Sequence, residues 1–182
     1  DDQLMQKYSG GTELTEQEFL TAIRKSVQSG KFFPVMGGDG RGIIVQTLLD
    51  AVVNFLPNPL DRGVTKGTNI KTGEPIERKP SDDEPFTALA FKIATDPFVG
   101  RLCFFRVYAG KLEAGSYVLN ARTGDKERVG RIVRMRADER DEVKEVFAGD
   151  ICALVGPKNT FTGDTLCDVE KPIMLETIKF AE

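Results

Sequence analysis

Apolar residues recur at helical spacing near the start of the chain. Phe19, Ile23 and Val27 fall on one face of a helix, and mostly polar residues separate them. Thr15 and Glu18 stand three residues apart just before this face, which is the spacing of a capping box. The pattern predicts a helix that begins after Thr15 and ends at the next glycine of the chain, where a left-handed cap is easily formed.

The following residues predict a short strand and then a second helix. Pro34 lies within the expected strand Lys31–Met36 and cannot donate a ladder hydrogen bond, so we expect this strand at a sheet edge. After the glycine-rich turn 37–42, helical spacing predicts a buried side made of Val45, Leu48, Leu49, Val52 and Leu56. One strand and its helices cannot form a covered sheet, so residues 1–60 are predicted to be the end of a larger α/β domain.

The rest of the chain changes from a polar segment to short apolar runs. Residues 61–84 contain Pro75, Pro80 and an acidic run without helical periodicity, and we predict a linker there. Strands are predicted near 86–93, 102–108, 116–120, 128–137, 150–155 and 164–168, separated by glycine-containing turns. This pattern predicts a mainly β domain over 85–182, closed into an antiparallel barrel without exposed edges.

Composition narrows the chemistry available to this fold. The 182 residues include no histidine, which excludes Ser-His-Asp and Cys-His catalytic arrangements and most catalytic zinc sites. The net charge is −3, so any contact with nucleic acid must come from a local basic patch. Cys103, Cys152 and Cys167 stand singly among apolar residues, and we expect reduced thiols in the core of a cytoplasmic protein.

The sequence gives no sign of a membrane partner. We find no stretch that approaches the roughly 20 apolar residues of a membrane span, and no signal-peptide pattern opens the chain. The chain begins with Asp1 rather than Met, and we therefore expect a piece of a longer protein.

Several blocks of the second half resemble the second domain of elongation factor G. The most specific is TDPFVG at Thr95–Gly100, within a longer similar stretch at 91–110. Further similar blocks lie at 110–120, 128–135, 148–151 and 162–167, and such glycine-turn blocks occur more loosely in the barrels of many translational GTPases. Upstream, Asp50–Pro59 is similar to the last helix of the family's GTPase domain and its exit.

The resemblance implies a fold and a function. It implies a six-stranded closed Greek-key barrel of the translation-factor domain II type, preceded by a partial α/β segment from the end of a P-loop GTPase domain. The intact parent would bind GTP and Mg²⁺ and hydrolyse GTP to drive ribosomal translocation of tRNA and mRNA. The barrel would contact the small-subunit ribosomal RNA and act as a relay to the remaining domains of the parent.

These 182 residues lack the motifs of a GTPase. They contain neither the GxxxxGK[ST] loop that cradles phosphates nor the Asn-Lys-x-Asp run that reads guanine. We expect no catalytic residue, metal, cofactor or GTP turnover in this chain. Gly37, Gly38 and Asp39 stand where the family has its guanine loop, so their backbone N–H groups could face the base. The alternative is a tight turn that binds nothing.

A basic run over 122–136 is the second candidate site. In a regular strand, Arg128, Arg134 and Arg136 would share one face, with Val129 and Met135 on the other. Arginine charge is the main source of contact with RNA phosphates. The resemblance extends the expected RNA contact to Arg101, just before the predicted strand 102–108. We predict ribosomal RNA contacts at Arg101, Arg128, Arg131, Arg134, Arg136 and Phe98. The alternative is a solvated face that is salt-bridged to the acidic run 138–142.

The phenylalanines are a further candidate for contact with RNA bases. Phenylalanines can stack on bases, but on alternating strands we expect core positions for Phe91, Phe104, Phe105, Phe147 and Phe161, with Phe98 as the exception.

A specialised paralogue, such as a ribosome-recycling factor, is one alternative function. A stand-alone RNA-binding β-barrel without a GTPase parent is another.

Overall fold

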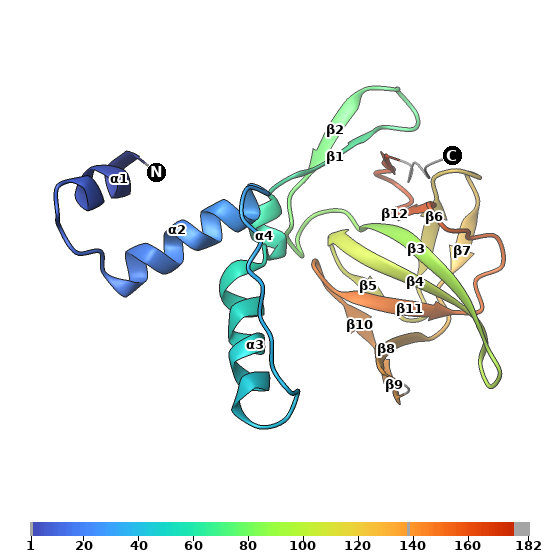
Figure 1. Cartoon of the computed structure of the whole chain (residues 1–182). Coiled ribbons are helices and arrows are strands. Elements are labelled where there is room, and N and C mark those ends of the chain that lie inside the picture. Colours follow the sequence, from blue (N-terminus) through green and yellow to red (C-terminus); the bar gives the residue numbers. More distant parts are fainter. Residues whose placement is uncertain (1, 138, 177–182) are drawn as a thin grey trace, which may run out of the picture. The chain divides into compact units, whose positions relative to one another are not determined.

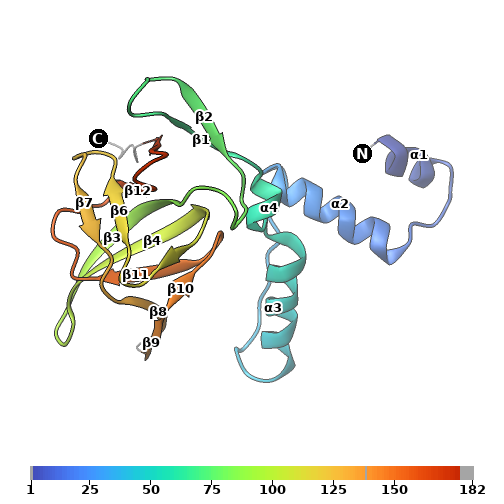
Figure 2. The same ribbon diagram turned by 180° about the vertical axis from the view of Figure 1, so that it is seen from behind.

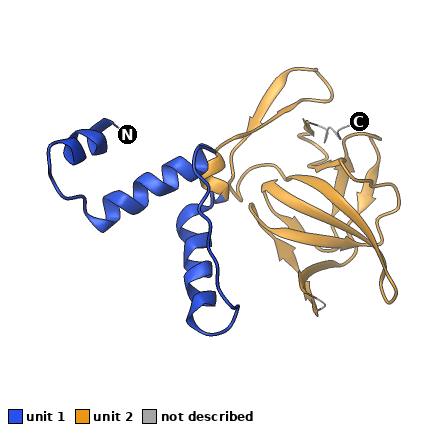
Figure 3. Ribbon diagram, in the orientation of Figure 1, with its two compact units in different colours: residues 1–58 blue, residues 59–182 orange. Residues whose placement is uncertain are grey.

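The computed structural model describes residues 2–137 and 139–176. The chain divides into two compact units, Asp1–Asn58 and Pro59–Glu182 (Figure 3). The helices of the first unit are α1 (Asp2–Ser9), α2 (Glu16–Gln28) and α3 (Ile43–Phe55).

The local signals for α2 are confirmed. Glu18 N donates to Thr15 Oγ1 at 3.3 Å, and Thr15 N donates to Glu18 Oε2 at 3.0 Å, which completes the capping box. The helix stops at Gly30, which has a φ of 70° and whose N–H donates to the carbonyl of Val27 at 2.9 Å. Arg24 then links α2 to α3, because its Nη1 donates to the carbonyl of Asn54 at 2.7 Å.

The predicted packing of the first unit is not found. No described residue of this unit is buried, and the apolar positions expected on the buried side of α3 are 39–58% exposed. Lys31–Met36 forms no strand, because no described segment of the chain pairs with it. A strand exists only with a ladder partner, so the pattern of these six residues was insufficient by itself.

One segment is apolar enough to be considered as a membrane span, contrary to our expectation. By length and composition alone, Ile43–Arg62 passes that test. The helix is interrupted at residues 56–58, however, and continues only as α4 (Pro59–Arg62). The 13 residues of α3 would extend about 20 Å, which is shorter than the roughly 30 Å hydrocarbon core of a bilayer.

A three-stranded antiparallel sheet opens the second unit. The strands β1 (Thr65–Thr68) and β2 (Pro75–Arg78) form a hairpin, and β13 (Met174–Leu175) pairs with β1 on its other side. The segment expected to be a linker therefore contains regular structure. Gly67 lies where β1 meets β13, and a Cβ at this position would come within 2.6 Å of the carbonyl oxygen of Met174.

The larger sheet is antiparallel, with the order β7-β6-β12-β3-β4-β11-β8-β9 (Figure 1). Five of the six predicted strands are present with small changes of boundary, whereas the strand predicted over 128–137 is divided between β7 and β8. The bounds are β3 (Thr87–Asp96), β4 (Gly100–Ala109), β6 (Tyr117–Asn120), β7 (Lys126–Arg128), β8 (Ile132–Arg136), β9 (Glu139–Val143), β11 (Ile151–Val155) and β12 (Thr165–Cys167). Two short strands, β5 (Leu112–Glu113) and β10 (Glu145–Val146), pair with each other.

Closure into a six-stranded barrel is not confirmed. Across the described ranges, no ladder joins the edge strands β7 and β9. The sheet nevertheless curls, because residues 129–131 connect β7 at one end of the strand order to β8 near the other. Val129 N donates to the carbonyl of Ser116 at 2.9 Å, while the carbonyl of Arg131 accepts from Val155 N at 3.0 Å. Figure 2 shows β6, β7 and β8 from behind.

The core of the second unit lies inside the curl of the larger sheet. Fourteen buried residues form its main cluster, including Phe105, Ile132 and Leu166. A second cluster lies between the two sheets and includes Leu119, Ile173 and Leu175. All three cysteines are buried and free, as predicted, and burial raises the pKa of the Cys103 thiol to about 12.

The phenylalanines are less buried than predicted. Phe105 is fully buried, whereas its neighbour Phe104 points to the outer face of β4 and is half-buried, as strand alternation requires. Phe91, Phe147 and Phe161 are exposed, which corrects the prediction that they are core residues.

Candidate nucleic-acid interface

The hairpin between β3 and β4 presents Phe98 on an ordered tip. Asp96 Oδ1 accepts hydrogen bonds from the backbone N–H groups of Phe98 at 2.9 Å and Val99 at 3.0 Å. Arg140 of β9 forms an ion pair with Asp96, and its guanidinium carbon lies 5.8 Å from the centroid of the Phe98 ring. The bond from the Phe98 amide is the main cause that lowers the pKa of Asp96. Phe98 itself remains 84% exposed.

Arg101 is held by the loop between β11 and β12. Its Nη1 donates to the carbonyl of Lys158 at 3.0 Å, and its Nη2 donates to the carbonyl of Thr160. The guanidinium carbon also lies 4.9 Å from the centroid of the Phe161 ring. Arg101 is half-buried and therefore positions this loop, which leaves less of its charge for a partner.

A buried carboxylate holds the same loop from its other side. Asp164 is 4% exposed and accepts hydrogen bonds from Arg122 Nε at 2.6 Å, Asn120 Nδ2 at 2.9 Å and Phe161 N at 2.8 Å. Burial alone would raise the pKa of Asp164, but the bonds from Arg122, Asn120 and Phe161 outweigh it, and the pKa is lowered. The sequence marked Asp164 only as part of a Gly-Asp turn, so this role was missed.

The basic run does not share a single face. Val129 and Ile132 both belong to the main core cluster, although they are three residues apart. A regular strand places such residues on opposite sides. The bend at 129–131 reverses the alternation, and Arg128 therefore does not share a face with Arg134 and Arg136.

Two of the predicted arginines are paired with carboxylates. Arg134 lies 3.2 Å from Asp150, and Arg136 lies 2.7 Å from Asp141 and 3.7 Å from Glu139. This geometry matches the alternative of a solvated, salt-bridged face at β8 and β9. Residue 138 of the acidic run lies outside the described residues.

Arg128 and Arg131 differ from the paired arginines. Both are exposed, and neither forms an ion pair or side-chain hydrogen bond with another described residue. Arg128 stands opposite the exposed Tyr117 in the β6–β7 ladder. The backbone bond between Arg131 and Val155 brings the loop that contains Lys158 beside this segment. We define the basic edge as Lys126, Arg128, Arg131 and Lys158.

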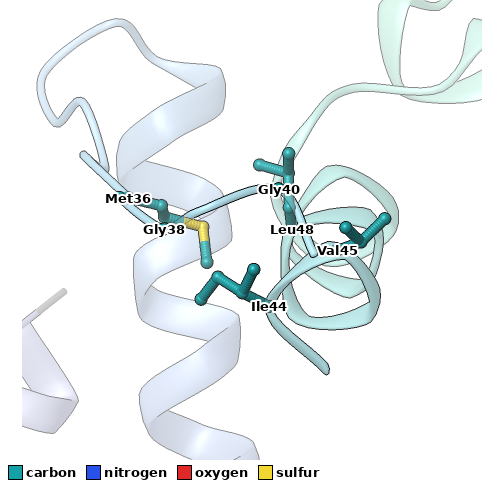
Figure 4. Close-up of a pocket in the computed structure, with 7 residues that line it drawn as sticks. Met36, Gly38, Gly40, Ile44, Val45 and Leu48 are labelled. Atoms are coloured by element: carbon teal, nitrogen blue, oxygen red, sulfur yellow. The ribbon is translucent and has the colours of Figure 1, made fainter. Parts of the chain in front are cut away.

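The glycine-rich loop of the first unit borders a small cavity. The cavity measures about 240 Å³ and is lined mainly by apolar groups, with Met36 and Gly38 facing Ile44 and Leu48 of α3 (Figure 4). A Cβ on Gly38 would lie 2.2 Å from Ile44 Cγ1, so a larger residue there would require Ile44 to shift. Gly37 also lines the cavity, and no hydrogen bond joins its amide or that of Gly38 to another described residue.

Asp39 does not line this cavity. Its Oδ1 instead accepts the Arg41 N–H at 2.9 Å, which stabilises the turn before α3. The structure thus brings two of the three predicted guanine-loop residues together and separates the third. Among the described residues, no group of three or more His, Cys, Asp or Glu residues is arranged to hold a metal.

The curled antiparallel sheet has a counterpart among known protein families. The family model described as elongation factor G domain 2 matches residues 85–169. A crystal structure of a protein from Thermus thermophilus is similar with a TM-score of 0.67 and 28% sequence identity, over 94% of this chain. The present chain covers 23% of the length of that protein.

These matches define a mainly β domain of the translation elongation factor class. Within this chain, residues 85–169 are similar to the second domain of elongation factor G.

Proposed function

We propose that the second unit contacts the ribosome through its basic edge and binds the small-subunit ribosomal RNA there. The observation that supports this most directly is the pair of exposed arginines, Arg128 and Arg131, without carboxylate partners among the described residues, on a domain of a translation factor family. Phosphate contacts depend on accessible Lys and Arg charge, and a guanidinium already paired to a carboxylate has less to offer.

Aromatic residues near the proposed contact would add to it. Tyr117 stands opposite Arg128 and is 60% exposed, so a base could stack on its ring. Phe98 is held in place by Asp96 and is a further stacking candidate on the β3–β4 tip. Arg101, Arg134 and Arg136 have internal partners, and we assign them a smaller share of the contact.

The first unit supports a proposal for the intact protein. In a longer cytoplasmic protein that carries a P-loop and binds GTP with Mg²⁺, the amides of Gly37 and Gly38 would face the guanine base, with the apolar wall of the cavity against its ring. GTP hydrolysis in such a protein would drive translocation of tRNA and mRNA. The exposed apolar side of α3 would then pack against the remaining strands of that domain.

Charge reversal at the basic edge tests the RNA contact. We expect Arg131→Glu to weaken binding of this chain to purified small ribosomal subunits by about tenfold and to lower the slope of log K against log salt by about 1. Binding is measured by co-sedimentation at several salt concentrations. Arg128→Glu should behave in the same way.

Lys71→Glu provides the matched control, because it makes the same change of charge in the β1–β2 turn. It should leave both affinity and salt slope nearly unchanged. Arg136→Glu should have an intermediate or small effect, since Asp141 and Glu139 already engage that arginine. An Arg131→Glu chain that binds like the Lys71→Glu chain would refute the proposed contact.

A further inference from the structure

A cavity lies between the two sheets of the second unit and α4. Its volume is about 250 Å³, and its lining includes Arg62, Gly63, Thr65, Arg106 and Tyr108. Arg62 comes from α4, Gly63 and Thr65 come from the start of the hairpin, and Arg106 and Tyr108 lie on the outer face of β4. Two arginines from segments far apart in the sequence thus meet at one cavity.

Neither arginine has an ion-pair or hydrogen-bond partner among the described residues. No ion pair or hydrogen bond joins the guanidinium of Arg62 or Arg106 to another described residue, and the Nε of Arg106 is buried without an acceptor. A buried donor without an acceptor costs free energy and is uncommon in folded proteins. None of the described residues that line the cavity carries a carboxylate.

Arg106 also contacts an aromatic ring of its own strand. The guanidinium carbon lies 5.4 Å from the centroid of the Tyr108 ring, so the ring contacts the cation without using its N–H groups. The donors of a guanidinium form a planar fork that matches the oxygens of a phosphate. Arg62 supplies a second positive charge at the same cavity.

The size of the cavity limits the ligand. Its volume is below the roughly 300–1,000 Å³ of sites that enclose whole drug-sized molecules. A single tetrahedral oxyanion fits this limit, whereas a nucleotide does not. We propose that Arg62 and Arg106 form a binding site for a phosphate group, either inorganic phosphate or the phosphate of a small monoester.

Arginine side-chain NMR tests this site directly. In the ¹⁵N-labelled 182-residue chain, inorganic phosphate should produce a saturable shift of the Arg106 Nε–H resonance, while chloride at the same ionic strength should not. Glycerol 3-phosphate forms a second titration, and the tighter of the two ligands identifies free phosphate or a monoester as the source. Absence of a saturable shift with both would overturn the proposal.

Three variants separate the site from general charge effects. Arg106→Gln and Arg62→Gln should each weaken phosphate binding by at least about tenfold, because each removes charge-assisted hydrogen bonds. Lys71→Gln makes the same change of charge in the β1–β2 turn and should leave the affinity unchanged. Arg62 is exposed on α4, so its variant tests the site even where Arg106→Gln disturbs folding. Equal weakening by Arg62→Gln and Lys71→Gln would contradict a specific site.

Discussion

Asp164 concentrates more polar contacts than any other carboxylate described above. It is buried, and its two oxygens accept from a guanidinium, an amide side chain and a backbone N–H. Through Arg122 and Phe161 it also anchors the loop whose other side is held by Arg101. A charge that is nearly removed from water is stable only with such partners, so the whole cluster depends on this one ionised group.

Asp164→Asn should therefore destabilise the second unit. We expect a loss of about 2–4 kcal/mol in the free energy of unfolding at pH 7, because Arg122 loses its ion-pair partner and an amide nitrogen replaces an acceptor. The pKa of Asp164 is lowered in the folded chain, so its stabilisation is present above the unfolded pKa of about 4 and is lost as the pH falls through the folded pKa. Urea unfolding over a pH series from neutral to strongly acidic measures both effects.

Asp125→Asn is the control for this prediction, since Asp125 lies on the exposed β6–β7 turn. It should change stability by less than about 0.5 kcal/mol. A pH dependence as steep in the Asp164→Asn chain as in the wild type would assign the acid sensitivity to other carboxylates, such as Asp96, whose pKa is also lowered.

At the scale of elements, the pairing of β1 with β13 depends on a missing side chain. At Gly67, a Cβ would come within 2.6 Å of both Ile173 Cγ1 and the carbonyl oxygen of Met174. The backbone atom cannot move aside without loss of the ladder, and Ile173 is fully buried. The small sheet therefore requires glycine at this position.

Gly67→Ala should destabilise the second unit by about 1–3 kcal/mol, through overpacking against β13. Thermal unfolding measures the change. Gly130→Ala is the matched control, because a Cβ there meets only the carbonyl of Val155 at 3.8 Å and φ does not require glycine. If both variants unfold at the same temperature, the close approach of β1 and β13 does not limit stability.

Local patterns predicted most elements but not their partners. The capping box of α2 and most strands of the larger sheet were predictable, because their signals lie within a few consecutive residues. The β1–β2 hairpin was not, since its strands are polar and β1 pairs with β13 about a hundred residues later. The prediction that Arg128 shares a face with Arg134 and Arg136 was wrong. Val129 and Ile132 both belong to the main core cluster, because the chain bends between them, and the alternation of apolar and polar residues does not reveal such a bend.

The candidate site was predictable as a list of charges rather than as an arrangement. The sequence identified Arg128, Arg131, Arg134 and Arg136 alike, and only the structure shows that Asp150 and Asp141 pair with two of them. The cavity of Arg62 and Arg106 carried no local signal, because its two arginines are joined only by the way the sheets pack.

At the scale of the whole molecule, the two units differ in how much they bury. The second unit encloses its own cluster of buried residues, whereas no described residue of the first unit is buried. Apolar burial is the main source of folding free energy, so the first unit has little of it to offset the entropy of ordering its helices.

Hydrogen exchange should show this difference. We expect amide protons of α2 and α3 to exchange at least about 100-fold faster than those of β3 and β4, because local opening of the helices costs less free energy. Exchange of the 182-residue chain in D₂O, read by NMR or mass spectrometry, provides the comparison. Similar protection in both units would show that the exposed apolar side of α3 is covered in solution.

The position of β12 has a consequence for how this protein is made. In the larger sheet β12 lies between β3 and β6, so these earlier strands meet only through a strand that follows β11 in the sequence. A ribosome that synthesises the protein must extrude residue 167 before the two halves of the sheet can join. Until then β3 and β6 each keep one unpaired edge in the nascent chain, and chaperones can bind there.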